Sequence, residues 1–175
     1  MLTGKFGNSV IYKRHSVRSF TGEPLLAEQV EHILHAGMAG PSASNAQPWF
    51  FVVIDEKGLL DAIAKGHPYA KMASKAQLAI LVCAKKDVVE KDPFYEQDLG
   101  AAVENMLLAA TEAGVGSCWC GVHRQPAKEV ERLFVDLLRM PDEIIPFALV
   151  VLGIPANETG PKDRFQEQRI HRNAW

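Results

Sequence analysis

The sequence predicts an α+β fold, either a mixed arrangement of helices and sheet or a three-layer sandwich. Helical and strand-like segments alternate along 175 residues, but the strands are few and unevenly spaced, unlike a regular βαβ repeat. A hydrophobic content of 47% suffices for one core. We therefore expect a single domain over residues 1–175.

The first half of the chain predicts a helix followed by two buried strands. The helix is expected over residues 24–39, where Pro24 suits the first turn and Gly40-Pro41 ends an apolar stripe. The nearly continuous aromatic and β-branched run Trp49–Ile54 is typical of a buried strand. Two short helices and a second strand are expected next, over residues 59–65, 69–75 and Leu78–Ala84.

The second half begins with the clearest helix, Tyr95–Ala113. Its apolar stripe lasts about four turns, and its alanines make it slim enough to pack against its own symmetry mate. Gly114 suits its C-terminal cap. A short strand and loop, a helix opened by Pro126 and a last strand are expected to follow, over Val115–Gly121, the residues after Pro126, and Ile145–Gly153.

The end of the chain is polar and basic after Pro155. Its last residue is Trp175, a large apolar side chain that is unfavourable in water. We expect this tryptophan to pack on another surface.

Charge and hydropathy exclude several classes of protein. The net charge is only −2, so no overall field favours nucleic acid or an anionic membrane. The best apolar run, residues 147–152, is far too short to span a bilayer, and the N-terminus lacks the apolar core of a signal peptide. We expect a cytoplasmic protein with no nucleic-acid or membrane partner.

Cysteines and histidines do not form a metal-binding pattern. An odd count of three cysteines with no secretory signal argues against a disulfide framework. Cys118 and Cys120 are either a redox or metal pair or two buried small side chains, and we favour the second interpretation. His32 and His35 have no matching set of carboxylates, so no metal site is expected.

The usual catalytic motifs are absent. The sequence has no phosphate-binding loop of the Gly-x-x-x-x-Gly-Lys-Ser/Thr type, no Gly-x-Gly-x-x-Gly between strand and helix, and no Gly-x-Ser-x-Gly turn. A cofactor can therefore carry the reaction.

Two polar segments are the candidate site. Arg14-His15-Ser16-Val17-Arg18 offers forked cationic donors and a hydroxyl, which suit a phosphate or a ring edge, although a solvated basic turn has the same composition. The loop from Pro41 to Trp49 concentrates two serines, an asparagine and a glutamine between prolines. Amide side chains suit the edge of an isoalloxazine or a base, or an ordinary turn.

Together these segments resemble the two N-terminal signatures of the nitroreductase family. Arg14-His15-Ser16-Val17-Arg18-Ser19-Phe20 is similar to the opening motif, and Pro41-Ser42-x-Ser44-Asn45-x-Gln47-Pro48-Trp49 to the second. The alanine-rich helix after Asp98, the segment Gly114–Gly121, the run Pro146–Pro155 and the tail with Arg164, His171 and Trp175 resemble the later family segments in the same order.

The resemblance implies a fold and an assembly. The expected fold is a three-layer α/β/α sandwich with a mixed, mainly antiparallel sheet. It also implies a homodimer with flavin sites at the subunit interface and a C-terminal tail that wraps the partner.

The resemblance also implies roles for individual residues toward FMN. Arg14 and Ser16 would contact the phosphate and ribityl region, with His15 beside them, and Arg164 would be a second phosphate ligand. Arg18 would lie near the N1–O2 edge, where its charge stabilises anionic reduced flavin; no side-chain nucleophile is expected. The remaining positions would reach the ring: Pro41, Ser42, Ala43, Ser44 and Asn45 from the partner subunit, and Trp119, Cys120 and Gly121 through backbone N–H groups near N5 and O4.

The implied activity is an FMN-dependent oxidoreductase. NAD(P)H would deliver hydride to flavin N5, and an electron-poor small molecule such as a nitroaromatic or quinone would then take the electrons in a ping-pong sequence. Two alternatives stay open. One is an FMN-binding storage or redox-sensing protein without turnover. The other is a relative that acts on an activated double bond, a halogenated aromatic or the flavin itself.

Overall fold

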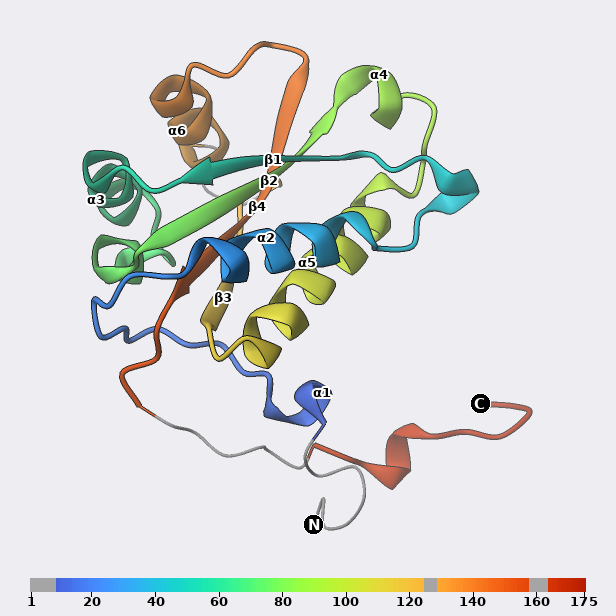
Figure 1. The fold of residues 1–175 in the computed structure, drawn as a ribbon. Helices are drawn as coiled ribbons and strands as arrows, with labels where there is room; N and C mark the ends of the chain where they lie inside the picture. The colour runs from blue at the N-terminus through green and yellow to red at the C-terminus, as the bar shows by residue number, and fades with distance from the viewer. Residues whose placement is uncertain (1–8, 125–128, 158–163) are drawn as a thin grey trace.

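The structure is a computed structural model that describes residues 9–124, 129–157 and 164–175. Within these ranges one sheet has four strands in the order β1-β2-β4-β3, and every neighbouring pair is antiparallel (Figure 1). An isolated bridge between Ser16 and Ser117 adds one parallel pairing at the edge of β3. The predicted α+β class with a mainly antiparallel sheet is confirmed. The strands are β1 (Trp49–Ile54), β2 (Leu78–Lys85), β3 (Gly116–Gly121) and β4 (Ile144–Gly153).

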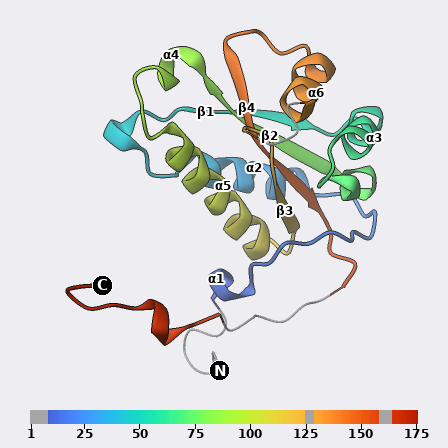
Figure 2. The ribbon, with the colours of Figure 1, turned by 180° about the vertical axis from the view of Figure 1, so that it is seen from behind.

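Helices cover both faces of this sheet, as the opposite views in Figures 1 and 2 show. Successive residues of a strand point to opposite faces, so β2 supplies Ile80 and Val82 to one core cluster and Leu81 and Cys83 to the other. Burial on both faces explains why β2 is apolar from Leu78 to Ala84 rather than alternating. One face packs on α2 (Ala27–Met38) and α5 (Tyr95–Glu112), the other on α3 (Lys57–Gly66), α6 (Glu129–Leu138) and the 3₁₀ turn η2 (Lys71–Lys75).

The expected elements agree with the structure to within a few residues. The helix expected over residues 24–39 begins only at Ala27, because the Gln29 side chain accepts from the Leu26 N–H at 2.8 Å and fixes the start there. Pro126 lies outside the described residues, where α6 is described from Glu129. Four short elements were not predicted: α1 (Val10–Lys13), η1 (Ala43–Asn45), α4 (Lys86–Val89) and η3 (Glu167–Arg169).

Helix α5 ends as the sequence predicted. Gly114 adopts a left-handed φ of 73°, and the Val115 N–H donates to the Ala110 carbonyl at 2.7 Å. The same turn leads directly into β3, so the end of α5 places the edge strand beside the helix.

The last described segment, Arg164–Trp175, extends away from the sheet and its helices (Figure 1). Every residue in it is exposed in the single chain, and Trp175 is fully so. Its ring stacks on His171 with a centroid distance of 4.4 Å. Among the described residues of its own chain, the ring contact that Trp175 makes is this one with His171. The wrapping of a partner stays a prediction.

Among the described residues, the helices are all too short or too polar to cross a membrane.

Candidate functional site

The Arg14–Arg18 segment is held along the open edge of β3. Ser16 forms a parallel bridge with Ser117, and the Val17 N–H donates to the Ser117 carbonyl at 2.9 Å. Val17 is buried in the core, while Ser16 and Arg18 on either side of it are exposed. Backbone contacts and one buried valine therefore fix the direction of the Arg18 side chain.

This close approach requires a glycine at position 116. A Cβ there would lie 2.8 Å from Cγ1 of Val17 and 3.1 Å from Cγ of Pro155. Because valine is short and stiff at χ1, it has little freedom to move aside. Gly116 therefore allows the segment to seat against the strand.

Arg18 opens onto a pocket of about 490 Å³ beside β3. Of the residues predicted from the sequence, the pocket brings together Arg18 and Trp119. It adds a second cation, Lys71, and an aromatic side chain, Tyr69, neither of which the sequence singled out. We call it the Arg18 pocket; it is lined by Arg18, Pro68, Tyr69, Lys71, Met72, Cys118 and Trp119.

A buried histidine, His67, holds the turn that brings Tyr69 to this pocket. His67 is fully buried; the Tyr69 N–H donates to its Nδ1 at 3.1 Å, and its Nε2 lies 3.0 Å from the Gly121 carbonyl. Since Nδ1 accepts, Nε2 carries the proton and donates to Gly121. Burial lowers the pKa of His67, in spite of the backbone hydrogen bond to Gly121. The neutral ring thus ties the Tyr69 turn to the end of β3.

The two cysteines of β3 are buried, as predicted, and one of them also lines the pocket. The neighbouring Cys120 lowers the pKa of the Cys118 thiol to about 7, with further lowering by Arg18 and Ser16 and opposed by burial. Cys118 and burial raise the pKa of Cys120, whose thiol donates to the Tyr69 carbonyl at 3.4 Å. Cys118 is therefore the more acidic thiol of the pair.

Besides the Pro41–Asn45 loop, six predicted site residues do not line the Arg18 pocket: Arg14, His15, Ser16, Cys120, Gly121 and Arg164. Arg14 is mostly buried, and its Nε pairs with Glu104 of α5 at 3.3 Å. The His15 ring donates from Nδ1 to the Lys13 carbonyl at 2.9 Å. Arg164 is exposed at the start of the last described segment. Arg14 thus lies in the segment beside β3 and pairs with α5, whereas Arg164 lies in the exposed tail.

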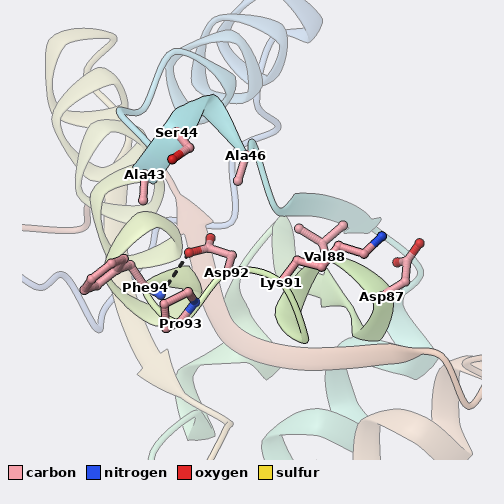
Figure 3. Close-up of a pocket in the computed structure, with 9 residues that line it drawn as sticks. All are labelled: Ala43, Ser44, Ala46, Asp87, Val88, Lys91, Asp92, Pro93 and Phe94. Atoms are coloured by element: carbon pink, nitrogen blue, oxygen red, sulfur yellow. Dashed lines mark hydrogen bonds between the residues drawn. The ribbon is translucent and has the colours of Figure 1, made fainter.

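The second predicted segment lines a different pocket, of about 410 Å³ (Figure 3). Ser44 and Asn45 have left-handed φ values of 50° and 57°, which few residues other than glycine adopt. The Ala43 N–H donates to Oδ2 of Asp98 at 3.0 Å and holds the loop at the start of α5. We call this the Ser44 pocket; it is lined by Ala43, Ser44, Ala46, Asp87, Val88, Lys91, Asp92, Pro93 and Phe94.

The two pockets share no lining residue. Within one chain, the Arg14–Arg18 segment and the Pro41–Asn45 loop are therefore parts of separate sites. Of the five loop positions predicted to reach a ligand, Ala43 and Ser44 line the Ser44 pocket.

The structure is a protein of helices and antiparallel sheet with a pocket at a sheet edge that Arg18 and Lys71 line. The chain belongs to the Nitroreductase family, whose model matches residues 11–80 and 64–154. A relative from Archaeoglobus fulgidus, provisionally named NADH dehydrogenase/NAD(P)H nitroreductase, is 39% identical over 171 residues, which are 95% of this chain and 97% of the relative.

Solved structures confirm the predicted nitroreductase-like fold. A provisionally named NADH dehydrogenase/NAD(P)H nitroreductase from Bacteroides thetaiotaomicron is 32% identical with a TM-score of 0.90, covering 99% of this chain and 100% of that chain. A nitroreductase-like protein from Desulfovibrio desulfuricans, solved in complex with FMN, is 29% identical with a TM-score of 0.79, covering 99% of both chains.

Proposed function

We propose that this protein is an FMN-dependent oxidoreductase that uses NAD(P)H to reduce an electron-poor small molecule. The observation that carries the proposal is the Arg18 pocket, in which a backbone-anchored arginine and Lys71 face a cavity of ligand size beside an edge strand. The FMN complex of the Desulfovibrio desulfuricans relative supports the same cofactor here.

The residues present suit FMN. Arginine donors match phosphate oxygens and the carbonyl and nitrogen edge of a flavin, and the segment supplies Arg14, Ser16 and Arg18 in succession. Among the described residues, the side of β3 away from β4 has a strand-like bridge only at Ser117, and the Gly121 carbonyl bonds to His67. Part of this edge is therefore available to a ring. The proposed ligand set is Arg14, His15, Ser16, Arg18, Trp119, Cys120, Gly121 and Arg164, completed by Pro41, Ser42, Ala43, Ser44 and Asn45 of a second copy.

When bound, FMN would supply the redox chemistry that couples NAD(P)H to an acceptor such as a nitroaromatic or quinone, in the proposed ping-pong sequence. The chain itself provides orientation and charge. Arg18 holds positive charge where negative charge develops at the N1–O2 edge, which lowers the cost of reduction. His67 bonds to both Tyr69 and Gly121 and so fixes their relative position. The Tyr69 side of the pocket is therefore formed before the ligand binds.

A homodimer completes the site in this proposal. Ala43 and Ser44 of the Pro41–Asn45 loop line a pocket that is separate from the Arg18 pocket. This separation supports the proposal that the loop serves a flavin other than the one at Arg18 of the same chain. The tail exposes Phe165, Ile170 and Trp175, and the edge strand β1 exposes Phe50 and Val53. Apolar surface of this kind is covered when a second copy packs on it.

Visible spectroscopy of the purified protein under argon tests the function. We expect a flavin spectrum that bleaches when NAD(P)H is added. A yellow protein that does not bleach would instead be a storage or redox-sensing protein. A protein that stays colourless after incubation with FMN would overturn the proposal. Light scattering of the FMN-loaded protein tests the assembly, and a monomer mass would contradict the shared site.

A further inference from the structure

Two buried carboxyl groups lie beneath the Ser42–Asn45 loop. Asp92, in the turn that precedes α5, is 5% exposed, and Asp98, in the first turns of α5, is 7% exposed. Aspartate is almost never buried to this degree without a partner. These two residues have no role in the function proposed above, so their burial needs another explanation.

The contacts of the pair leave one oxygen unexplained. Asp98 accepts from the Ala43 N–H through Oδ2 at 3.0 Å. Asp92 accepts from the Phe94 N–H through Oδ1 at 2.9 Å, as the dashed line in Figure 3 shows. Oδ2 of Asp92 is buried and has no hydrogen-bond partner among the described residues. A buried carboxylate oxygen with no donor is strongly unfavourable.

A proton held between the two carboxyl groups resolves this. Burial raises the pKa of Asp98, as does the neighbouring Asp92, against the lowering effect of the Ala43 N–H. Two adjacent buried carboxyl groups cannot both be ionised at low cost, and a shared proton gives the remaining oxygen its hydrogen bond.

The other charged groups nearby do not replace this proton. On the α4 side, Asp87 and Lys91 line the same pocket but are exposed, and Asp87 lies 3.8 Å from Lys85. On α5, Glu96 pairs with Arg124 at 3.1 Å. Residues 42–47 of the loop carry no titratable side chain.

The loop depends on this carboxyl pair. Ser44, Asn45 and Gln47 all have left-handed φ values, a costly conformation that persists only when neighbouring contacts enforce it. The hydrogen bond from Ala43 to Asp98 ties this strained turn to helix α5. A change at Asp98 is therefore transmitted to the loop.

We propose that Asp98 keeps a proton, which its carboxyl donates to Oδ2 of Asp92, and that both are positioning residues, which hold the Ser42–Asn45 loop in the shape that binds flavin. The proposal rests on the proposed function for its link to FMN. When the shared proton is lost, the two carboxylates repel, Asp98 shifts from Ala43, and the loop loosens.

The test is the pH dependence of FMN affinity, measured by quenching of flavin fluorescence between pH 5 and 9. Binding that requires one proton weakens by up to tenfold per pH unit while that proton is lost. We expect this loss in the parent protein and a smaller one in Asp92→Asn, whose amide donates to Asp98 at every pH. The control Asp142→Asn removes an exposed charge that lines neither pocket and keeps the parent profile. Equal slopes in the parent and Asp92→Asn would overturn the proposal.

A second measurement needs no FMN. A carboxyl whose pKa is raised on folding stabilises the protein fully below its unfolded value of about 4, and that stabilisation is lost as pH rises through the folded value. The apo protein should therefore show a decrease in Tm with rising pH that Asp92→Asn reduces. If this occurs and no form binds FMN, the proposed function fails while the shared proton stands. If both proteins show the same pH dependence of Tm, the shared proton is wrong.

Discussion

The Arg18 pocket and the Ser44 pocket are built in opposite ways. The first is fixed by backbone contacts, with Ser16 and Val17 pinned to Ser117 of β3. The second depends on side-chain carboxyl groups, with Ala43 held by Asp98. Backbone anchoring resists changes of charge but is sensitive to added volume, whereas carboxyl anchoring is sensitive to protons. The two halves of the proposed flavin site should therefore respond to different perturbations.

Their pH dependences also have opposite signs. Burial lowers the pKa of His67, so its stabilisation is complete above the unfolded value of 6.5 and is lost as pH falls below it. Burial and Asp92 raise the pKa of Asp98, so its stabilisation is lost as pH rises above about 4. A falling pH therefore weakens the contacts of Tyr69 beside the Arg18 pocket, and a rising pH weakens the Ser42–Asn45 loop.

The largest expected effect is the loss of His67. The substitution His67→Ala leaves the Gly121 carbonyl and the Tyr69 N–H without their partner, at about 1–3 kcal/mol for each buried group. We expect urea denaturation to show a loss of about 2–4 kcal/mol and a weaker decrease in stability below pH 6.5. The matched control His35→Ala alters an exposed residue of α2 and should change stability by less than about 0.5 kcal/mol. Equal effects from both substitutions would contradict the role of His67.

A methyl group at position 116 should disrupt the packing of the Arg14–Arg18 segment on β3. In Gly116→Ala the new Cβ lies 2.8 Å from Val17, so the segment must move away from β3 at a cost of about 1–3 kcal/mol. FMN affinity should fall by about tenfold or more in a fluorescence titration. Gly100→Ala is the control, because its nearest neighbour is Trp119 at 3.7 Å, an ordinary contact. An unchanged affinity in Gly116→Ala would show that the close seating of Val17 is unimportant.

Removal of the Arg18 charge tests the electrostatic role of this side chain and leaves the backbone contacts of the segment in place. Arg18→Ala should slow reduction of bound FMN by about tenfold, equivalent to about 1.4 kcal/mol, in anaerobic stopped-flow measurements. Arg18→Lys keeps the charge and should recover most of the rate. Full FMN affinity together with an unchanged reduction rate in Arg18→Ala would refute the electrostatic role.

The smallest effect is expected at Glu104. Its carboxylate pairs with Arg14 at 3.3 Å and competes with a phosphate for the same guanidinium. Glu104→Gln should increase FMN affinity by about threefold at low salt and change stability by less than about 1 kcal/mol. The gain should disappear at high salt, since this pair is partly exposed. No gain at low salt would mean that Arg14 does not contact the phosphate.

Periodic apolar patterns made most of the fold predictable. The strand Trp49–Ile54 matches its expected bounds, and the α5 stripe and its Gly114 cap were read from spacing and turn chemistry. The four-residue helices α1 and α4 are too short to produce a period. Boundaries such as that of α2 depended on one side chain, Gln29, whose contact the sequence does not reveal.

The candidate site was only partly predictable, because a pocket is assembled from distant segments. Arg18 and Trp119 were predicted, yet Lys71 and Tyr69 came to the same pocket through a turn with no motif of its own. The Asp92–Asp98 pair was missed for a related reason. The two acidic residues are six positions apart in the sequence and form no motif, and the path of the chain between α4 and α5 buries both.

The exposed tail has a consequence for how the protein tolerates dilution. Phe165, Ile170 and Trp175 find little apolar cover on their own chain. In the proposed dimer these side chains are buried only when two molecules associate. Part of each protomer's stability therefore depends on protein concentration. The melting temperature should then rise with the logarithm of concentration, and dilution should release flavin and partner together.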